Sequence, residues 1–493
     1  MATRHRKAIL VTLIVCLSGL ACGTEEVPLD DVVLLPQGKL DDYRSTIGQE
    51  FDVTGVMSVR LTGSDTELVG EARIERAREL AATAVDKLTK AFNDKLEKIF
   101  DKATRKSTVS VMVRFCTSTF DGLVAGEGTS YHMIYSAEVA GPGDMLSYLP
   151  LEAEGDRKVL KVGLSDQTVS LTFEPVDNTG DAYPQYLDMF QDGLDIAIHV
   201  GGDYNDPRSD LDKAKAIYNE LVALKLKSPV ERFDDLALES GDFVGELDVA
   251  GRKVAVRARL YHADMAPDDQ LDKLVDAYKQ SAASADIVVY TGHAGISMDY
   301  SGVVVHYNPR VALKGDDFAT IELPDKYQVF VFSGCETYSG YADSLYKNPK
   351  KTSANLDVVT TVNFSSSRAP TMPALVRTML DQTLGTWRPN TWDEVLRALN
   401  DAHKVWDAIY GVHGLSDNPK ISPLADPTTI GKDCLIHDDC PGIDNLCIRG
   451  SYFSVGRVCG AACVDDSGCP AGSKCKWVYS SYFSRAIRQC FSQ

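Results

Sequence analysis

The sequence predicts an α/β protein in which helices pack on a mostly parallel sheet, preceded by an α+β domain and followed by a small disulfide-rich module. Three observations predict this arrangement. Strand-type and helix-type segments alternate through residues 186–410, as in a parallel sheet with crossover helices. A long amphipathic helix pattern and then strand patterns fill residues 43–180. Eight of the 12 cysteines lie within residues 433–493.

The first residues have the pattern of an export signal. Three basic residues precede an apolar run over 8–20 that is too short to span a membrane. Small residues lead into Cys22, as in a bacterial lipobox, although Gly19 stands where that motif usually has Leu. We therefore expect residues 1–21 to be a signal peptide of the lipoprotein type, with Cys22 carrying the lipid that anchors the chain to a bacterial cell envelope. Ordinary cleavage near Ala21, giving a secreted protein, is the alternative.

The acidic balance of the chain argues against nucleic acid as a partner. The formal net charge is −19, with 51 basic and 70 acidic residues. Removal of residues 1–21, which hold three basic and no acidic residues, leaves 48 basic residues against 70 acidic ones, or −22. Such a surface repels phosphate backbones. The polar, acidic stretch 22–42 is expected to be a tether between the anchor and the first folded domain.

Residues 43–180 are expected to form an accessory α+β domain. Apolar residues spaced by three or four predict one long helix over Ser64–Phe100. The strands predicted after it are Thr108–Phe115, Tyr131–Val139, Val159–Leu164 and Thr168–Val176, in an antiparallel sheet that carries the helix. The domain contains no clear catalytic set, so a prodomain that covers an active cleft remains one open interpretation.

Residues 186–410 are expected to form the α/β domain. The predicted strands are Asp195–Val200, Val254–Tyr261, Asp286–Thr291, Gln328–Ser333 and Leu356–Phe364. The predicted helices are Asp210–Leu224, Pro267–Ala283, Met372–Leu384 and Thr391–Ile409. A strand pair bent about Ala250-Gly251 is expected to run into the second strand.

Two of these strands end in residues suited to thiol chemistry. His293 follows the strand Asp286–Thr291, and Cys335 follows the strand Gln328–Ser333. Buried parallel strands deliver such residues to the carboxyl edge of a sheet. A cysteine attacks a carbonyl as the thiolate, and an imidazole supplies that form by taking the proton. The separation of 42 residues (335 − 293) leaves room for one excursion and a return strand.

The two strand ends carry a family resemblance. The strings are Thr291-Gly-His293-Ala-Gly295 and Ser333-Gly-Cys335-Glu-Thr337. They resemble the His–Gly and Gly–Cys signatures of the caspase–gingipain–separase superfamily, the clan CD cysteine peptidases, and are similar to gingipain-like and CHAT domains respectively. The resemblance covers about residues 186–410. It implies a caspase-like sandwich and an endopeptidase that hydrolyses protein or peptide substrates without a cofactor or a metal.

The resemblance also implies a role for each residue of the site. Cys335 is expected to be the nucleophile, and His293 the general base and then the general acid. The backbone N–H groups of Cys335 and of the pair Ala294 and Gly295 are expected to form the oxyanion hole. Ala294 departs from the family pattern, in which Gly commonly follows the His, and this changes the turn that aims the N–H groups.

Each site residue also has a structural alternative. Cys335 is either an inert core thiol or the partner of Cys116 in a disulfide, which would make the cysteine count even. His293 is alternatively a hydrogen-bonded structural histidine. Glu336 either contacts a basic group of the substrate or is a solvated carboxylate.

A Pro- and Asn-containing linker, 411–432, is expected to lead into the cysteine-rich module 433–493. Its cysteines are Cys434, Cys440, Cys447, Cys459, Cys463, Cys469, Cys475 and Cys490. A Cys-x5-Cys-Pro pattern recurs with an offset of 29 residues (463 − 434), which indicates a duplicated module. The spacings lack paired Cys-x2-Cys zinc knuckles, so disulfides are expected, with their connectivity left open. The repeat resembles cysteine-rich modules at the ends of secreted bacterial proteins, which implies surface display or binding.

These observations predict an exported cysteine endopeptidase with a membrane anchor. The main alternative is a catalytically inactive caspase-like surface lipoprotein that acts in binding or adhesion. A third possibility is an acyl-transfer enzyme that uses the same dyad. The sequence does not define the oligomeric state.

Overall fold

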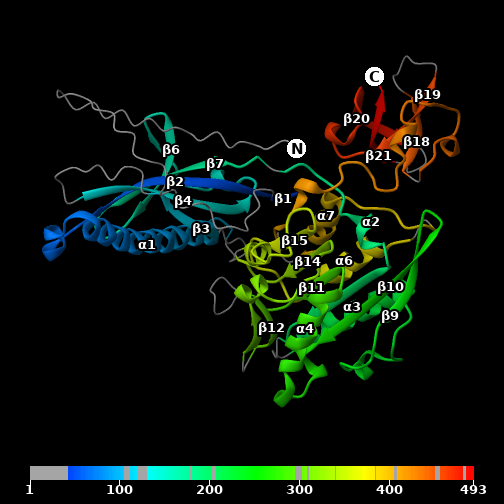
Figure 1. The fold of residues 1–493 in the computed structure, drawn as a ribbon, viewed down its shortest axis with the longest axis horizontal. Coiled ribbons are helices and arrows are strands. Elements are labelled where there is room, and N and C mark those ends of the chain that lie inside the picture. Colours follow the sequence, from blue (N-terminus) through cyan, green and yellow to red (C-terminus); the bar gives the residue numbers. More distant parts are fainter. Residues whose placement is uncertain are drawn as a thin grey trace.

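The structure is a computed structural model. It describes residues 43–104, 112–119, 130–177, 179–202, 207–294, 302–307, 310–338, 340–382, 385–404, 408–442, 444–449, 456–480 and 485–492. Figure 1 shows three units in chain order: a sheet with one long helix, a larger α/β unit, and a small β unit at the C-terminus. The expected signal peptide, the lipidation site Cys22 and the tether 22–42 lie outside the described residues. Within them, no helix has the length and apolarity needed to cross a bilayer.

The first unit is an antiparallel six-stranded sheet with the order β3-β4-β2-β7-β6-β5. Its strands are β2 (Gly48–Arg60), β3 (Met112–Thr119), β4 (Ser130–Pro142), β5 (Glu152–Glu154), β6 (Arg157–Gly163) and β7 (Thr168–Pro175). β2 lies where the sequence pattern predicted no strand, yet it pairs with both β4 and β7 and is central to the sheet.

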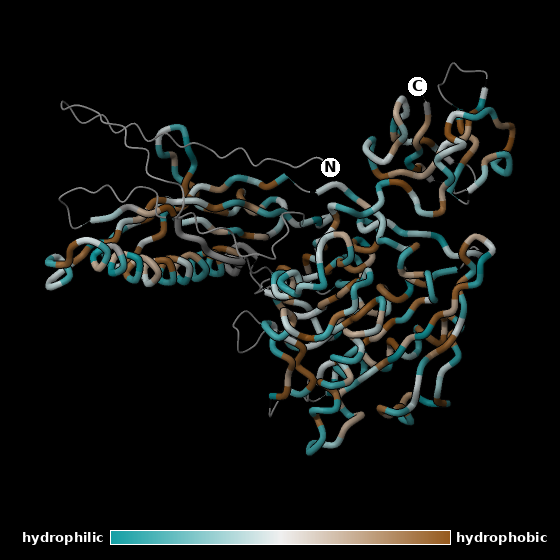
Figure 2. The backbone as a smooth tube through the Cα atoms, in the orientation of Figure 1, coloured by the Kyte–Doolittle hydropathy of each residue, from teal (hydrophilic) through white to brown (hydrophobic). Residues whose placement is uncertain are grey.

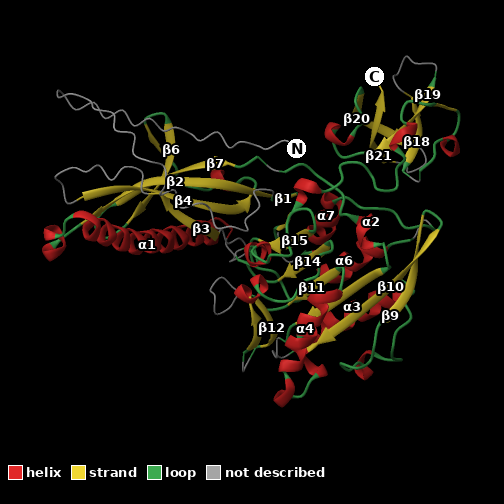
Figure 3. Ribbon diagram, in the orientation of Figure 1, coloured by secondary structure: helices red, strands yellow, loops and turns green. Residues whose placement is uncertain are grey.

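The long helix α1 (Gly70–Thr104) lies along this sheet, as predicted (Figure 3). It begins later than the expected Ser64, because Gly63–Glu67 form a separate 3-10 turn, η2, and Gly70 has a positive φ of 60°. Figure 2 shows hydrophilic and hydrophobic residues alternating along it. Its apolar stripe packs against the strands of the sheet, and the fully or largely buried members are Ala77, Ala81, Val85, Leu88, Phe92, Leu96 and Phe100.

The second unit is built on an eight-stranded sheet with the order β1-β16-β15-β14-β11-β8-β10-β9. Its strands are β1 (Arg44–Ser45), β8 (Leu194–Val200), β9 (Phe243–Val249), β10 (Arg252–His262), β11 (Ile287–Thr291), β14 (Gln328–Ser333), β15 (Leu356–Thr361) and β16 (Tyr410–His413). The five central strands, from β15 to β10, are parallel, and β9, β16 and β1 pair antiparallel at the edges. The protein is therefore a mixed α/β chain with a partly parallel sheet.

Helices cover both faces of this sheet and form two separate cores. On one face lie α2 (Tyr186–Met189), α3 (Ser209–Ala223), α6 (Thr371–Leu380) and α7 (Trp392–Ala402). On the other lie α4 (Asp272–Ser284), α5 (Tyr341–Tyr346) and the hairpin of β12 (Gly302–His306) and β13 (Val311–Lys314). Val289 and Val331 face the first core, whereas Val288 and Phe330 face the second. This alternation is what a strand buried on both sides requires.

The turn between β9 and β10 agrees with the expected bend at Ala250-Gly251. Val249 pairs with Arg252, which leaves a two-residue loop. Both loop residues have positive φ, 55° for Ala250 and 81° for Gly251. Such a two-residue turn matches the right-handed twist of the strands that it joins.

The chain after α7 differs from the prediction. The helix expected over Thr391–Ile409 ends at Ala402, and β16 begins at Tyr410. The expected linker 411–432 thus begins inside a sheet strand. It then packs on the cysteine-rich unit, where Ile421 forms a bridge with Cys463.

The cysteine-rich unit is a duplicated hairpin. The first copy contains β17 (Asp433–Cys434), the 3-10 turn η10 (His437–Asp439), β18 (Asn445–Arg449) and β19 (Arg457–Ala462), and the second contains η11 (Asp466–Gly468), β20 (Ser473–Ser480) and β21 (Arg485–Ser492). Four disulfides join Cys434 to Cys447, Cys440 to Cys459, Cys463 to Cys475, and Cys469 to Cys490. In each copy the first cysteine pairs with the third and the second with the fourth, so the expected duplication extends to the connectivity.

Candidate active site

β11 and β14 bring the two predicted catalytic residues to the same edge of the sheet. Thr291, the last residue of β11, pairs with Ser333, the last residue of β14. His293 and Cys335 therefore each lie two residues beyond a paired position. Neighbouring strands run ~4.8 Å apart. The parallel register thus places these two residues on adjacent loops.

Glycines keep these loops side by side beyond the strand ends. The N–H of Gly292 donates a hydrogen bond to the carbonyl of Ser333 at 3.2 Å, which extends the ladder by one residue. A Cβ atom on Gly334 would lie 2.6 Å from the Cβ of Ala294 and 3.0 Å from the carbonyl oxygen of Gly292. The close approach of the His293 and Cys335 loops therefore depends on the absence of a side chain at Gly334.

Cys335 is a free thiol that lies half-buried in this edge. Its Sγ donates a hydrogen bond to the carbonyl oxygen of Ser365 at 3.7 Å. Burial raises the pKa of this thiol; the bond to Ser365 and the charge of Lys213 act in the opposite direction, while the charge of Glu336 adds to the increase. The thiol is therefore mainly protonated at neutral pH in this arrangement.

The free state of Cys335 bears directly on the disulfide alternative. A bridge to Cys116 would consume the thiol, and the structure leaves it unbonded. The side chain of Cys116 itself is outside the described part of the chain, although its backbone is part of β3.

Glu336 is buried, with 3% of its surface exposed, so the solvated-carboxylate interpretation is wrong. It also has a positive φ of 56°, in the left-handed region that non-glycine residues rarely adopt. This conformation turns the chain sharply just after Cys335. A backbone of this kind persists only where the surrounding structure holds it.

Several hydrogen bonds hold the turn after Cys335. The N–H of Glu336 donates to the carbonyl of Asn363, and the N–H of Tyr338 to the carbonyl of Thr361, at 3.1 and 2.8 Å. The hydroxyl of Thr337 donates to the carbonyl of Phe332 at 2.9 Å. The segment Glu336–Tyr338, which we call the nucleophile turn, is thus attached to β14 and to the chain around the end of β15.

His293 lies half-buried on the neighbouring loop. Its ring packs on that of Tyr307, with 4.4 Å between the ring centroids, and its carbonyl accepts a hydrogen bond from the hydroxyl of Tyr290 at 2.6 Å. Ala294 is half-buried and contributes the close contact with Gly334. Gly295, the other expected oxyanion-hole residue, lies outside the described residues.

Two groups near Cys335 were not predicted from the sequence. His403, 2% exposed, accepts at Nε2 a hydrogen bond from the N–H of Ser366 at 2.8 Å, next to the carbonyl that receives the thiol. Lys213, 7% exposed, donates from Nζ to the hydroxyl of Thr291 at 3.1 Å. The position of Lys213 on the apolar stripe of its helix was a usable signal, because a buried lysine is rare.

His199 and the cysteines of the C-terminal unit, residue types that can bind metals, have structural roles here. His199 stacks on Tyr261 with 4.4 Å between ring centroids, and burial lowers its pKa to about 3, so it is neutral and cannot act as an acid at physiological pH. In the cysteine-rich unit, neighbouring sulfur atoms lie within 4.8 Å of one another, but they belong to the four disulfides. Paired sulfurs do not provide the thiolates that zinc requires.

Comparison with known proteins does not place the chain in a family. No family model matches it, and no curated protein matches it. A solved structure described as "Structure of Protease" aligns over 63% of this chain and 70% of that chain, with 10% sequence identity and a TM-score of 0.26. So loose a superposition carries no argument, and the functional case depends on the geometry described above.

Proposed function

We propose that the chain is an exported cysteine endopeptidase with a caspase-like catalytic unit, in which Cys335 is the nucleophile and His293 the general base. The observation that carries this proposal is the register of β11 and β14, which sets both residues two positions beyond the pair Thr291–Ser333. A free thiol at this point supports it, because the eight cysteines of the C-terminal unit are all paired.

The proposed reaction begins with a change of hydrogen-bond partner. The thiol leaves the carbonyl of Ser365 and turns toward His293, which accepts its proton as the sulfur attacks the peptide carbonyl. The tetrahedral oxyanion forms beside the N–H groups of Cys335, Ala294 and Gly295. Collapse breaks the peptide bond, His293 gives the proton to the departing amine, and water then hydrolyses the thioester.

The proposed setting is the bacterial cell envelope, with a lipid on Cys22 as the membrane attachment. Four disulfides in the C-terminal unit are compatible with an extracellular protein, since such bonds persist in oxidising compartments. The proposed substrates are proteins or peptides. Glu336 is buried beside the nucleophile, so a basic substrate group would contact it only where binding opens the nucleophile turn.

A test of this proposal combines thiol reactivity with hydrolysis. Alkylation of Cys335 by iodoacetamide is followed by peptide mass spectrometry from pH 6 to 10, and cleavage is measured on a mixed peptide library. We expect Cys335→Ala to abolish cleavage and His293→Ala to lower it by at least about 100-fold, in line with the loss of a general base. Cleavage that persists in Cys335→Ala would refute the proposal. Activity on thioesters or esters alone would favour acyl transfer.

One observation favours the second candidate, an inactive caspase-like surface lipoprotein that binds a partner. The thiol is half-buried, is hydrogen-bonded to a backbone carbonyl, and has a pKa raised by burial. An inert core thiol has these properties. Under this candidate, His293→Ala leaves the alkylation of Cys335 unchanged at every pH and no peptide in the library is cut.

A further inference from the structure

The accessory unit reaches the nucleophile turn through one buried carboxylate. Glu50, on β2 of the accessory sheet, is 4% exposed, and Tyr338, at the end of the nucleophile turn, is fully buried. The hydroxyl of Tyr338 donates a hydrogen bond to the carboxylate of Glu50. Tyr338 lies three residues after Cys335, so this bond links the accessory sheet to the segment that carries the nucleophile.

A shared apolar cluster surrounds this bond. It consists of Tyr43, Ala140, Tyr338, Val362 and Ile409, which come from both units and are all buried. The ring of Tyr43 packs edge-on against that of Tyr338, with 5.4 Å between centroids. The junction between the units is thus a packed core in which a carboxylate can be retained only with hydrogen-bond donors around it.

Glycines on both sides make this junction close. A Cβ on Gly48 of the accessory sheet would lie 2.6 Å from Ile409 of the α/β unit, and a Cβ on Gly411 of β16 would overlap the ring of Tyr43, which directly precedes β1. The accessory sheet thus packs against the α/β unit so closely that Gly48 leaves no room for a side chain.

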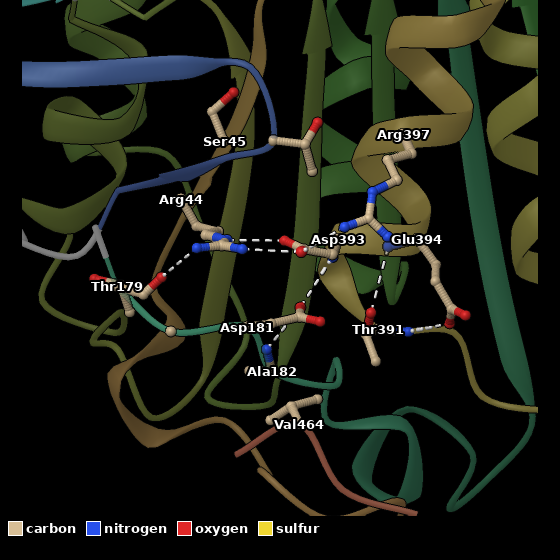
Figure 4. Close-up of polar contacts among 12 residues, drawn as sticks. Arg44, Ser45, Thr179, Asp181, Ala182, Thr391, Asp393, Glu394, Arg397 and Val464 are labelled. Atoms are coloured by element: carbon tan, nitrogen blue, oxygen red, sulfur yellow. Dashed lines mark hydrogen bonds and ion pairs between the residues drawn. The ribbon is translucent and has the colours of Figure 1, made fainter. Parts of the chain in front are cut away.

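The chain enters and leaves the accessory unit at one place on α7 (Figure 4). Arg44 of β1 forms a two-point ion pair with Asp393, at 2.8 and 2.9 Å, and also donates to the carbonyl of Thr179. Asp181, just after the accessory unit, accepts from the N–H of Asp393 at 2.9 Å. We call Arg44, Thr179, Asp181 and Asp393 the clasp. It fixes the accessory sheet relative to the catalytic unit.

We propose that Glu50 is a positioning residue of the active site: the accessory unit holds the nucleophile turn, and with it Cys335, through the bond from Tyr338 to Glu50. This inference rests on the proposed function for its catalytic meaning. It makes the accessory unit an integral part of the site, in place of a detachable prodomain. The physical need is the left-handed backbone of Glu336, which is two residues from Tyr338 and requires support from its surroundings.

The test uses the mature full-length protein and two variants that break the same bond from opposite sides. Glu50→Leu removes the acceptor with a side chain of similar size, whereas Tyr338→Phe removes the donor hydroxyl and leaves the carboxyl group of Glu50 in place. Tyr278→Phe is the control for a buried hydroxyl, because that hydroxyl has no hydrogen-bond partner in the structure. Glu174→Leu, at an exposed position of β7, is the control for the loss of a carboxylate from the accessory sheet. Circular dichroism establishes that each variant is folded.

The readout is the pH dependence of Cys335 alkylation by iodoacetamide, which requires no peptidase activity. We expect Tyr338→Phe and Glu50→Leu each to loosen the turn, move the reactivity midpoint toward that of an exposed thiol, and raise the rate at pH 7.5 on the order of tenfold. The double variant should show no more than the larger single effect, because both changes remove one bond. Where the wild type cleaves peptides, kcat should fall with KM unchanged, since misplacement of a reacting group affects the chemical step.

The inference is overturned if Tyr338→Phe has the same alkylation profile as the wild type. A shift in Glu50→Leu alone would also overturn it, because that result assigns the effect to the loss of the carboxyl group and not to the bond with Tyr338. These outcomes are independent of the proposed function: a chain that cleaves no peptide can still show the coupled shift, and an active peptidase can lack it. Should Glu50→Leu fail to fold, Tyr338→Phe alone decides.

Discussion

Asp181 offers the sharpest test of the clasp, because its carboxylate lies where burial disfavours the charge. Burial raises its pKa from the ordinary value of 3.8 to about 6, and the nearby charge of Asp393 adds to the effect. Oδ1 accepts hydrogen bonds from the N–H groups of Ala182 and Asp393, both at 2.9 Å. Asn has a carbonyl oxygen that can accept the same two bonds, so Asp181→Asn removes the charge with little loss of geometry.

The direction in which stability changes with pH follows from the number of protons that the folded and the unfolded states bind. Between pH 4 and 6 the folded protein holds a proton on Asp181 that the unfolded chain releases, so the free energy of unfolding falls as the pH rises through this window. A pKa increase of roughly two units corresponds to about 3 kcal/mol lost above pH 6, at 1.36 kcal/mol per unit. Asp181→Asn should recover most of this loss, so we expect the variant to be more stable than the wild type by about 2 kcal/mol at pH 7.5.

The assay is urea unfolding at pH 4, 5, 6 and 7.5, followed by tryptophan fluorescence. Trp392 is a suitable reporter, since it is fully buried near the clasp and its backbone N–H donates to the carbonyl of Ala182. Asp276→Asn, at an exposed position on α4, controls for the general effect of one fewer negative charge. An equal difference in stability between wild type and Asp181→Asn at pH 4 and pH 7.5, or a less stable variant at pH 7.5, would contradict this assignment of the pH effect to Asp181.

Two further predictions concern a close contact and a buried lysine. Gly334→Ala should lower the free energy of unfolding by about 1–3 kcal/mol, because the new methyl group meets Ala294 at 2.6 Å, and a second change, Ala294→Gly, should restore part of this loss. Gly163→Ala is the matched control, since a methyl group there meets nothing within 4 Å, and an equal loss of stability at both glycines would contradict the prediction. Burial lowers the pKa of Lys351 to about 7, so the folded state lacks a proton that the unfolded chain binds between pH 7 and 10. The melting temperature should therefore rise across that range, and Lys351→Met should abolish the rise in a calorimetric pH series. A rise that persists in the variant would show that another group produces it.

The sequence was most informative about the central strands and least informative about the edges. The runs Ile287–Thr291 and Gln328–Ser333 are apolar on both faces, which is typical of a parallel strand covered on both sides, and the structure confirms both strands. β1, with two residues, and β16, with four, are too short for a periodic pattern to appear. Their pairing is determined by tertiary contacts, such as the hydrogen bond from Ser45 to the carbonyl of Tyr410, that no local pattern records.

The hydrogen-bond partners that surround the candidate site could not be predicted from the sequence. Strand-end position correctly placed His293 and Cys335 on adjacent loops, because register follows from parallel pairing. It did not reveal the bond of the thiol to Ser365, which is 30 residues away, or the bond of Tyr338 to Glu50, which is 288 residues away. The pKa of a thiol depends on such long-range neighbours, so the sequence could suggest the residue type but not its protonation state.

That protonation state constrains the chemistry under the proposed function. A thiol whose pKa is raised by burial is mostly protonated at neutral pH, so forming the thiolate before the substrate binds carries a free-energy cost. A resting thiolate–imidazolium pair therefore does not fit this arrangement. Proton transfer to His293 during the attack on the substrate avoids that cost, because the charge on sulfur is spread into the forming bond as it develops. Such a mechanism requires Cys335 to be held in a defined place when the substrate arrives, which is the role that the bond from Tyr338 to Glu50 would serve.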